Sequence, residues 1–250
     1  MMPTITLITR FLNNELDIKR VKDSSKNGLQ VKGKTNVNKI GFCVDACLES
    51  FKKAKKQGCD LVIVHHGLLW KGKEKYPDLK KKRIAYLKKN NLSLYAAHLP
   101  LDKHPVYGNN MQLARLFGLK EIKPFAKHNS QFIGYYGKLN KNANSFVKEV
   151  NKKLQTKSVA HMFGAKKTKV VGVVSGAAPE HVVDCHNLGI DTYLTGETSH
   201  LAYNVNKELK MNVIYAGHYK TEGIGLKAIM KLLNQKFKIQ CVFIDNPTRL

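Results

Sequence analysis

Two histidines at the end of an apolar run are the first residues of this chain whose types could do chemistry. The run Leu61–Val64 leads directly into His65 and His66, and Gly67 follows. Such a β-branched run predicts a strand, and α/β proteins place their chemistry at the carboxyl ends of strands. Neighbouring strand residues point to opposite faces, so both imidazoles serve one site only if the strand ends or kinks there. Gly67 permits that turn.

Acidic residues follow two other histidines at a fixed spacing. Asp102 lies four residues after His98, and Glu222 lies four residues after His218. On a helix this spacing would place each acid on the same face as its histidine. Because Pro100 favours an extended backbone before it, we expect a loop that must fold back to bring the pair together.

These segments belong to an internal repeat. The blocks Ile40–Phe42, Gly58–Asp60 and His65-His66 recur 131 positions later as Val171–Val173, Gly189–Asp191 and Gly196-Glu197. Tyr95–His98 and Asp102 recur 120 positions later as Tyr215–His218 and Glu222. Duplication predicts two similar halves around a pseudo-two-fold axis, with a metal site between the halves. One half would supply His65, His66, His98 and Asp102, and the other Glu197, His218 and Glu222.

The donor types indicate which metals such a site would hold. Imidazole and carboxylate without thiolate suit Zn, Fe, Mn, Co or Ni, and the number of donors favours two divalent ions about 3.5–4 Å apart. His98 either ligates a metal or, as we favour, orients a ligand or bound water. Glu197 fits two roles equally well: a proton acceptor, or part of a helix start that Thr198 or Ser199 caps. The turn Ser175–Ala178 lacks the glycine spacing and lysine of a P-loop, which indicates an ordinary turn.

Strands and helices alternate along the chain and must position these residues. Helices are expected over 5–16, 46–57, 76–90, 109–117, 143–154, 180–188, 201–209 and 224–234, and strands over 29–31, 39–44, 61–66, 92–97, 132–139, 169–174, 192–195, 212–216 and 239–244. This pattern predicts an α/β fold with mixed sheets flanked by helices. The repeat divides it into halves at 1–125 and 126–250, with C-terminal strands able to complete the first half and no inserted extra domain.

Composition restricts the environment and the partners. Lys plus Arg number 43 against 18 Asp plus Glu, a net charge of +25 that would attract nucleotides or nucleic acid. The lysine clusters fall on expected helices, so a solvated surface explains them as well. Five cysteines without a Cys-x-x-Cys pair suit a reducing cytoplasm. No apolar run approaches the roughly 20 residues that span a bilayer, and the first residues lack a signal-peptide pattern.

Taken together, these motifs resemble the GTP cyclohydrolase I type 2-like family of dinuclear-metal proteins. The matching segments are Asn27–Val31, Val64–His66, His98 with Leu101-Asp102, Gly189–His200, and Gly217-His218 with Thr221-Glu222. The resemblance implies a duplicated α/β fold and two metals held by His65, His66, Asp102, His218 and Glu222. It also implies a ring-shaped homohexamer, a trimer of dimers with metal sites facing an internal cavity. Gly67 departs from the proline that many relatives have after the histidine pair.

Three functions are consistent with these residues. The first is a metal-dependent hydrolase acting on a nucleotide, for example by opening the guanine imidazole ring of GTP, with Glu197 or His98 moving protons. The second is a nucleic-acid-binding hexameric ring whose metals are structural or regulatory. The third is a metal-dependent phosphohydrolase, which shares the site with the first and differs in substrate.

Overall fold

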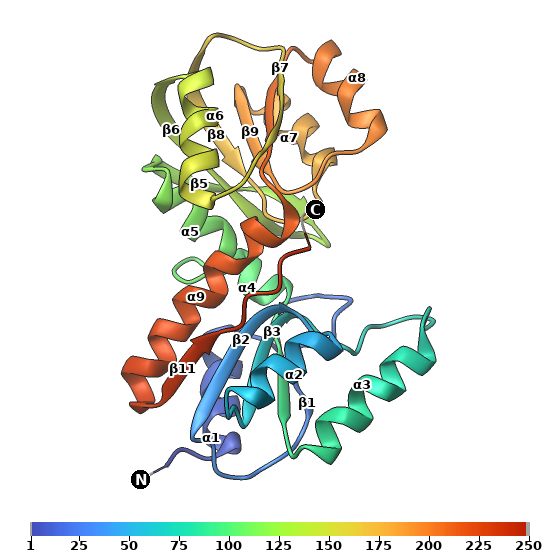
Figure 1. The fold of residues 1–250 in the computed structure, drawn as a ribbon. Helices are drawn as coiled ribbons and strands as arrows, with labels where there is room; N and C mark the ends of the chain where they lie inside the picture. Colours follow the sequence, from blue (N-terminus) through green and yellow to red (C-terminus); the bar gives the residue numbers. More distant parts are fainter. Residues whose placement is uncertain (1, 249–250) are drawn as a thin grey trace. The chain divides into compact units, whose positions relative to one another are not determined.

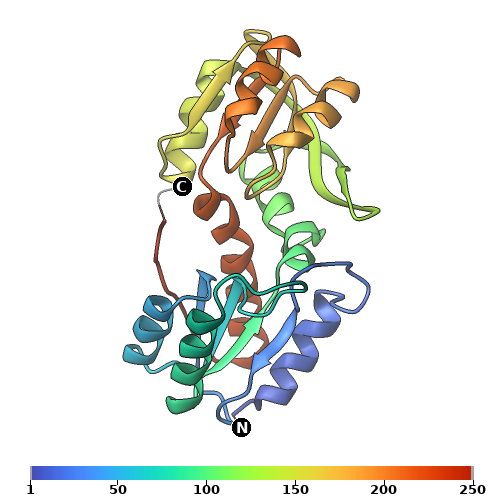
Figure 2. The same ribbon diagram turned by 90° about the vertical axis from the view of Figure 1, so that its right-hand side faces the viewer.

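Alternating apolar runs and amphipathic segments produce two mixed sheets flanked by helices, which confirms the predicted α/β class (Figures 1 and 2). The computed structural model describes residues 2–248. The chain divides into two compact units. Unit 1 comprises Met1–Leu101 and Gly225–Asn246, and unit 2 comprises Asp102–Ile224 and Pro247–Leu250.

Unit 1 is built on a five-stranded sheet of order β1-β4-β3-β2-β11. β2, β3, β4 and β11 are parallel, and β1 pairs antiparallel with β4. Helices α2 and α3 cover one face, and α1 and the unit 1 part of α9 lie on the other (Figures 1 and 2). The bounds are β1 (Gly28–Val31), β2 (Lys39–Asp45), β3 (Leu61–His66), β4 (Ser93–Ala96), β11 (Gln240–Phe243), α1 (Ile5–Glu15), α2 (Leu48–Lys56), α3 (Pro77–Lys89) and α9 (His218–Phe237).

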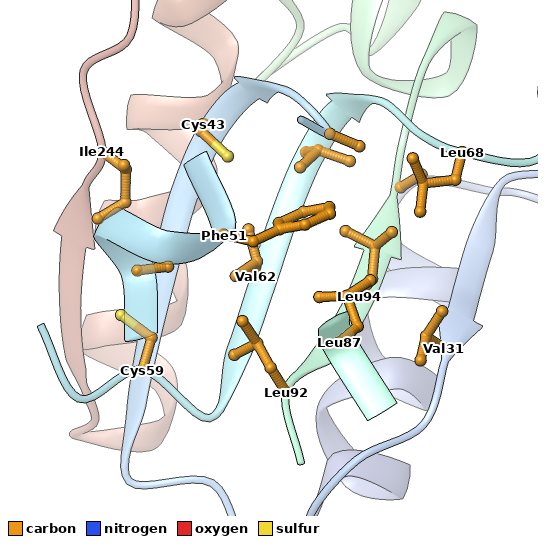
Figure 3. Close-up of a cluster of buried hydrophobic side chains, with 14 residues drawn as sticks. Val31, Cys43, Phe51, Cys59, Val62, Leu68, Leu87, Leu92, Leu94 and Ile244 are labelled. Atoms are coloured by element: carbon orange, nitrogen blue, oxygen red, sulfur yellow. The ribbon is translucent and has the colours of Figure 1, made fainter. Parts of the chain in front are cut away.

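The side chains of β3 alternate between the two faces of the sheet, and those of one face lie in the core beneath α2 and α3. Val62 and Val64 are fully buried there with Phe51 of α2 and Leu87 of α3, next to Leu94 of β4 (Figure 3). Burying such a side chain contributes roughly 1.5–3 kcal/mol, so this core holds β3 firmly. The end of β3 is therefore a fixed platform for the residues that follow Val64.

Unit 2 carries a six-stranded sheet of order β5-β6-β8-β9-β10-β7. β8, β9 and β10 are parallel, and the other pairings are antiparallel. Apolar residues of α5 and α6 share one buried cluster with β8, β9 and β10. The bounds are β5 (Lys120–His128), β6 (Gln131–Asn142), β7 (Val159–Met162), β8 (Lys167–Val173), β9 (Thr192–Thr195), β10 (Asn212–Tyr215), α5 (Asn109–Leu116), α6 (Ala143–Leu154), α7 (Val182–Asn187) and α8 (His200–Glu208). The short helix α4 (Leu99–Lys103) begins in unit 1 and ends in unit 2.

The two sheets share a four-strand order, as the predicted duplication requires. β7-β10-β9-β8 repeats the order and directions of β1-β4-β3-β2, and β7 begins 131 positions after β1. The pairing of Ile40 with Leu61 recurs at the same offset as Val171 with Thr192. The structural units do not follow the boundary at residue 125 that the sequence repeat predicts. Instead, the chain leaves unit 1 after Leu101 and returns to it at Gly225. As a result, β11 completes the sheet of unit 1.

Four local expectations are wrong. The loop expected after His98 is the helix α4, because Pro100 lies in its first turn, where no backbone N–H is needed. The loop expected after His218 is the first turn of α9, which begins six residues before the expected helix start. β5 and β7 carry no clear apolar alternation, so the sequence did not indicate them.

The structure also describes the cysteines and the length of the helices. All five cysteines are unbridged. Within residues 2–248, no helix combines the length and the apolar composition that crossing a bilayer requires.

Candidate metal centre

Three imidazoles gather at the carboxyl end of the sheet in unit 1. His65 and His66 end β3, and His98 follows β4. One ring nitrogen from each of the three lies within 4.8 Å of the others. The ring centroids of His65 and His66 are 4.7 Å apart, so the strand end does turn both neighbours toward one cluster. This cluster of His65, His66 and His98 is called the histidine cluster below.

Each histidine of this cluster is held at Nδ1 by an oxygen of the protein. Nδ1 of His65 lies 2.9 Å from the carbonyl oxygen of Ala97, and Nδ1 of His66 lies 2.8 Å from Oδ1 of Asp45. Nδ1 of His98 lies 3.0 Å from Oδ1 of Asp23. Such contacts fix the tautomer and ring orientation of histidines that ligate metals through Nε2. The cluster thus has the support that a set of metal-binding imidazoles needs.

The buried carboxylate of Asp23 contacts several other groups besides His98. Its carboxylate also accepts hydrogen bonds from the backbone N–H groups of Ser25 and Leu99, both at 2.9 Å, and from the side chain of Asn27 at 2.8 Å. Burial favours a higher pKa for Asp23, but the hydrogen bond and charge of His98 outweigh it and hold this pKa well below its usual range. The Asp23 carboxylate is therefore an ionised anchor for His98.

In unit 2, the start of α9 places His218 and Glu222 on one helical face. Nε2 of His218 lies 3.0 Å from Oε2 of Glu222, and Nδ1 lies 2.6 Å from Oε1 of Glu197. Burial would lower the pKa of His218, but the hydrogen bonds and charges of Glu222 and Glu197 raise it to about 9. Glu197 thus holds His218 as Asp23 holds His98.

The second carboxylate of unit 2 belongs to Asp102. Its Oδ1 accepts hydrogen bonds from Nδ2 of Asn109 at 2.9 Å and from Oγ of Ser175 at 3.0 Å. Carboxylate oxygens of Asp102 and Glu222 lie within 4.8 Å of one another. Next to Ser175, a Cβ at Gly176 would collide with Oε1 of Glu222, and the φ of +71° there also favours glycine. Ser175 therefore holds the Asp102 carboxylate, and the absence of a side chain at Gly176 leaves room for the Glu222 carboxylate.

All the predicted site residues therefore fall into two donor sets, one in each unit. The set of unit 1 is the histidine cluster, and the set of unit 2 is Asp102, His218 and Glu222, with Glu197 behind His218. Imidazole and carboxylate donors of this kind fit divalent Zn, Fe, Mn, Co or Ni. The alternative capping role at the start of α8 falls to Ser199, whose side chain accepts from the N–H of Ala202.

Sequence reasoning missed the residues that hold the donors: Asp23, Asp45, Asn109 and Ser175. The only signal for Asp23 was its place in a polar loop before the Asn27–Val31 motif. Nothing in the sequence links Asp45 to His66, since the two meet only through the parallel pairing of β2 with β3.

Comparison with known proteins identifies the family. The Duf34/NIF3 (NGG1p interacting factor 3) family profile matches residues 3–249. The chain belongs to the Duf34/NIF3 family. A Duf34/NIF3 relative from Pyrococcus abyssi is 41% identical over 246 residues, which cover 97% of this chain and 98% of that protein. A relative from Pyrococcus horikoshii is 42% identical with the same coverage. Both are named "GTP cyclohydrolase 1 type 2 homolog", which confirms the resemblance read from the motifs.

Solved structures share the Duf34/NIF3 fold along the whole chain. The protein ybgI, of unknown function, has a TM-score of 0.91 at 30% identity and covers 99% of this chain and 100% of its own. A protein of Thermus thermophilus has a TM-score of 0.86 at 34% identity with the same coverage. Reduced HcgD from Methanocaldococcus jannaschii has a TM-score of 0.86 at 25% identity and covers 97% of this chain.

Proposed function

We propose that this Duf34/NIF3 protein binds two divalent metal ions and uses them to hydrolyse a nucleotide. The ligands would be His65, His66, Asp102, His218 and Glu222, with the donor sets of the two units sharing the ions. The observation that carries the proposal is the support of the imidazoles: all four candidate histidines have Nδ1 engaged by a protein oxygen.

Divalent ions held by such donors lower the pKa of water and polarise an electrophile. The protein's own contribution is to hold and move protons near the donors. Glu197 contacts Nδ1 of His218 and also lines an open pocket of about 620 Å³, which supports its proposed role as the acceptor of a proton from a reacting water. The contact between Nδ1 of His98 and Oδ1 of Asp23 supports the proposed role of His98 in moving protons at the other donor set.

The names of the relatives and the net charge of the chain support a nucleotide as the substrate. The archaeal relatives carry the name "GTP cyclohydrolase 1 type 2 homolog", and the +25 net charge favours a phosphorylated substrate. Hydrolytic opening of the guanine imidazole ring of GTP is the reaction we propose to test first. Hydrolysis of a phosphoester is the alternative outcome at the same donors.

Turnover assays test the activity. Protein loaded with Zn, Fe, Mn, Co or Ni is incubated with GTP and other nucleotides, with and without chelator. Chromatography measures the conversion of GTP to a product whose guanine imidazole ring is open. Free phosphate is measured in parallel to identify phosphohydrolase activity. We expect turnover that chelator abolishes and that Glu222→Gln reduces at least 100-fold. His186→Asn, on α7 and exposed, is the control. Metal-dependent turnover of no nucleotide would remove the proposal.

The shared centre has a separate test. Anomalous scattering from crystals of the loaded protein would identify and count the ions, with two per subunit expected. A ligand bond reaches only about 2.0–2.2 Å, so imidazoles of His65 and His218 more than about 8 Å apart would refute a shared pair.

The +25 charge also favours a second candidate, a nucleic-acid-binding ring with structural or regulatory metals. Its homohexamer, a trimer of dimers, would be seen by light scattering coupled to size exclusion. Binding through phosphates should weaken steeply as salt rises. A flat salt response, or no binding at physiological salt, would count against this candidate.

A further inference from the structure

A basic pocket of about 500 Å³ lies in unit 1, on the segment that follows the histidine pair. Residues of the β3-to-α3 connection and the first turns of α3 line it, among them Trp70, Lys73, Lys75, Tyr76, Lys80 and Arg83. Its volume is within the range of small-molecule sites, about 300–1,000 Å³. We call it the Trp70 pocket.

The charges of the Trp70 pocket are partly neutralised and partly available. Lys80 pairs with Glu74, the single acid of the lining, at 2.7 Å. Lys73, Lys75 and Arg83 have no acidic partner anywhere in residues 2–248. Three cations without an internal counter-ion attract an anion of several charges, and a polyphosphate has that chemistry.

Two exposed aromatic rings accompany these cations. Trp70 is 40% exposed and Tyr76 is 66% exposed. An exposed aromatic face beside basic side chains is the arrangement on which nucleobases stack while the phosphates meet the cations. The chemistry of the lining therefore matches both parts of a nucleotide.

The Trp70 ring is held in place before any ligand arrives. Its Nε1 donates to the carbonyl oxygen of Gly67 at 2.9 Å, and its ring meets that of His98 edge-on with centroids 5.0 Å apart. Backbone hydrogen bonds of 2.8 Å tie Leu69 to Lys26 and Lys71 to Ser24. Ser24 and Lys26 follow Asp23 closely in sequence, so the chain segment that anchors His98 also fixes Trp70.

We propose that the Trp70 pocket binds a nucleoside polyphosphate, with the base against Trp70 and the phosphates at Lys73, Lys75 and Arg83. The ring contact between Trp70 and His98 would then bring the bound base beside the histidine cluster. The assignment rests on the proposed function only in treating this ligand as the substrate, because binding needs no turnover.

Tryptophan fluorescence tests the proposal on the full chain, since Trp70 is the only tryptophan. Metal-free protein in chelator is titrated with GTP, guanosine and tripolyphosphate. GTP and guanosine should quench Trp70, whereas tripolyphosphate should compete with GTP without quenching. The triple variant Lys73→Ala, Lys75→Ala, Arg83→Ala should weaken GTP binding at least 30-fold and leave guanosine binding within twofold. Calorimetry of Trp70→Phe should show about tenfold weaker GTP binding.

The matched control removes the same charge elsewhere in unit 1, with Lys52→Ala, Lys56→Ala and Lys88→Ala on exposed positions of α2 and α3. It should change GTP affinity less than threefold. Unchanged Trp70 emission at millimolar GTP, or equal losses in the two triple variants, would overturn the proposal. Loss of GTP binding in the double variant Lys157→Ala, Lys220→Ala would also overturn it, because these two residues line the pocket that Glu197 lines in unit 2. Saturable GTP binding without metal-dependent turnover of GTP would refute the proposed hydrolase activity and leave the binding proposal intact.

Discussion

Glu197 and Glu222 hold the imidazole of His218 from its two nitrogens. Oε1 of Glu197 lies 2.6 Å from Nδ1, and Oε2 of Glu222 lies 3.0 Å from Nε2. Burial alone would lower the pKa of this histidine, but the two carboxylates raise it to about 9. At neutral pH the metal-free protein therefore carries an imidazolium where a metal ligand is proposed, and metal and proton compete for it.

The first prediction concerns this competition. Below pH 9, uptake of Zn²⁺ by chelator-stripped protein should release about one proton from His218. The Zn²⁺ affinity should therefore fall about tenfold for each unit by which the pH is lowered. Isothermal titration at pH 7.5 in two buffers of different ionisation enthalpy measures the proton count. His218→Asn should remove that proton, and His186→Asn should not. An unchanged count in His218→Asn would contradict the assignment.

Glu197→Gln should lower both the pKa of His218 and the metal affinity. The amide still offers an oxygen to Nδ1, but it no longer supplies a negative charge, so the pKa should move toward the ordinary value of about 6.5. Loss of an outer hydrogen-bond partner typically costs about 10–100-fold in metal affinity. NMR titration of the imidazole and competition with a chelating dye measure the two effects. Glu208→Gln, exposed on α8, is the control and should change neither.

The stability of the metal-free protein should depend on pH through the same group. Because the folded pKa of His218 is raised to about 9, its stabilisation is fully present below about pH 6.5 and is lost as pH rises through 9. Urea unfolding at pH 6, 7.5 and 9.5 should show a falling free energy of unfolding. The fall should be smaller in Glu222→Gln. Equal slopes in the two proteins would show that other groups cause it.

Asp23→Ala should destabilise unit 1 by about 2–4 kcal/mol, because it leaves several buried donors unsatisfied. Since the pKa of Asp23 is lowered in the folded state, its stabilisation is present above about pH 3.9 and is lost as pH falls further. Urea unfolding measures the loss, and Trp70 emission reports on unit 1. Asp78→Ala, whose side chain is 95% exposed, should cost less than about 0.5 kcal/mol.

Two glycines of unit 2 separate backbone strain from contact with the site. Gly176 and Gly189 have φ values of +71° and +67°, so alanine at either should cost about 1–2 kcal/mol. A Cβ at Gly176 would meet Glu222, whereas a Cβ at Gly189 would meet no atom within 4 Å. Gly176→Ala should therefore also weaken metal binding at least tenfold, and Gly189→Ala should leave it unchanged. Calorimetric metal titration distinguishes them.

Much of the fold was accessible from the sequence because its elements obey simple periods. The apolar run Leu61–Val64 predicted β3, and the repeat predicted equivalent strands 131 positions apart. Pro100 misled the local prediction because it is unfavourable within a helix but acceptable in a first turn. The partners Asp23 and Asp45 could not be predicted, since contacts across a loop or between parallel strands leave no periodic signal.

The place of β11 has a consequence for biosynthesis. Its residues pair with β2 in parallel, Gln240 beside Lys39 and Phe243 beside Phe42, so about two hundred residues of chain separate the partners. Until β11 leaves the ribosome, β2 remains an open edge with unsatisfied backbone groups, the kind of surface on which nascent chains aggregate. A ribosome stalled before Gln240 is made would hold a chain in which β11 cannot complete the sheet of unit 1.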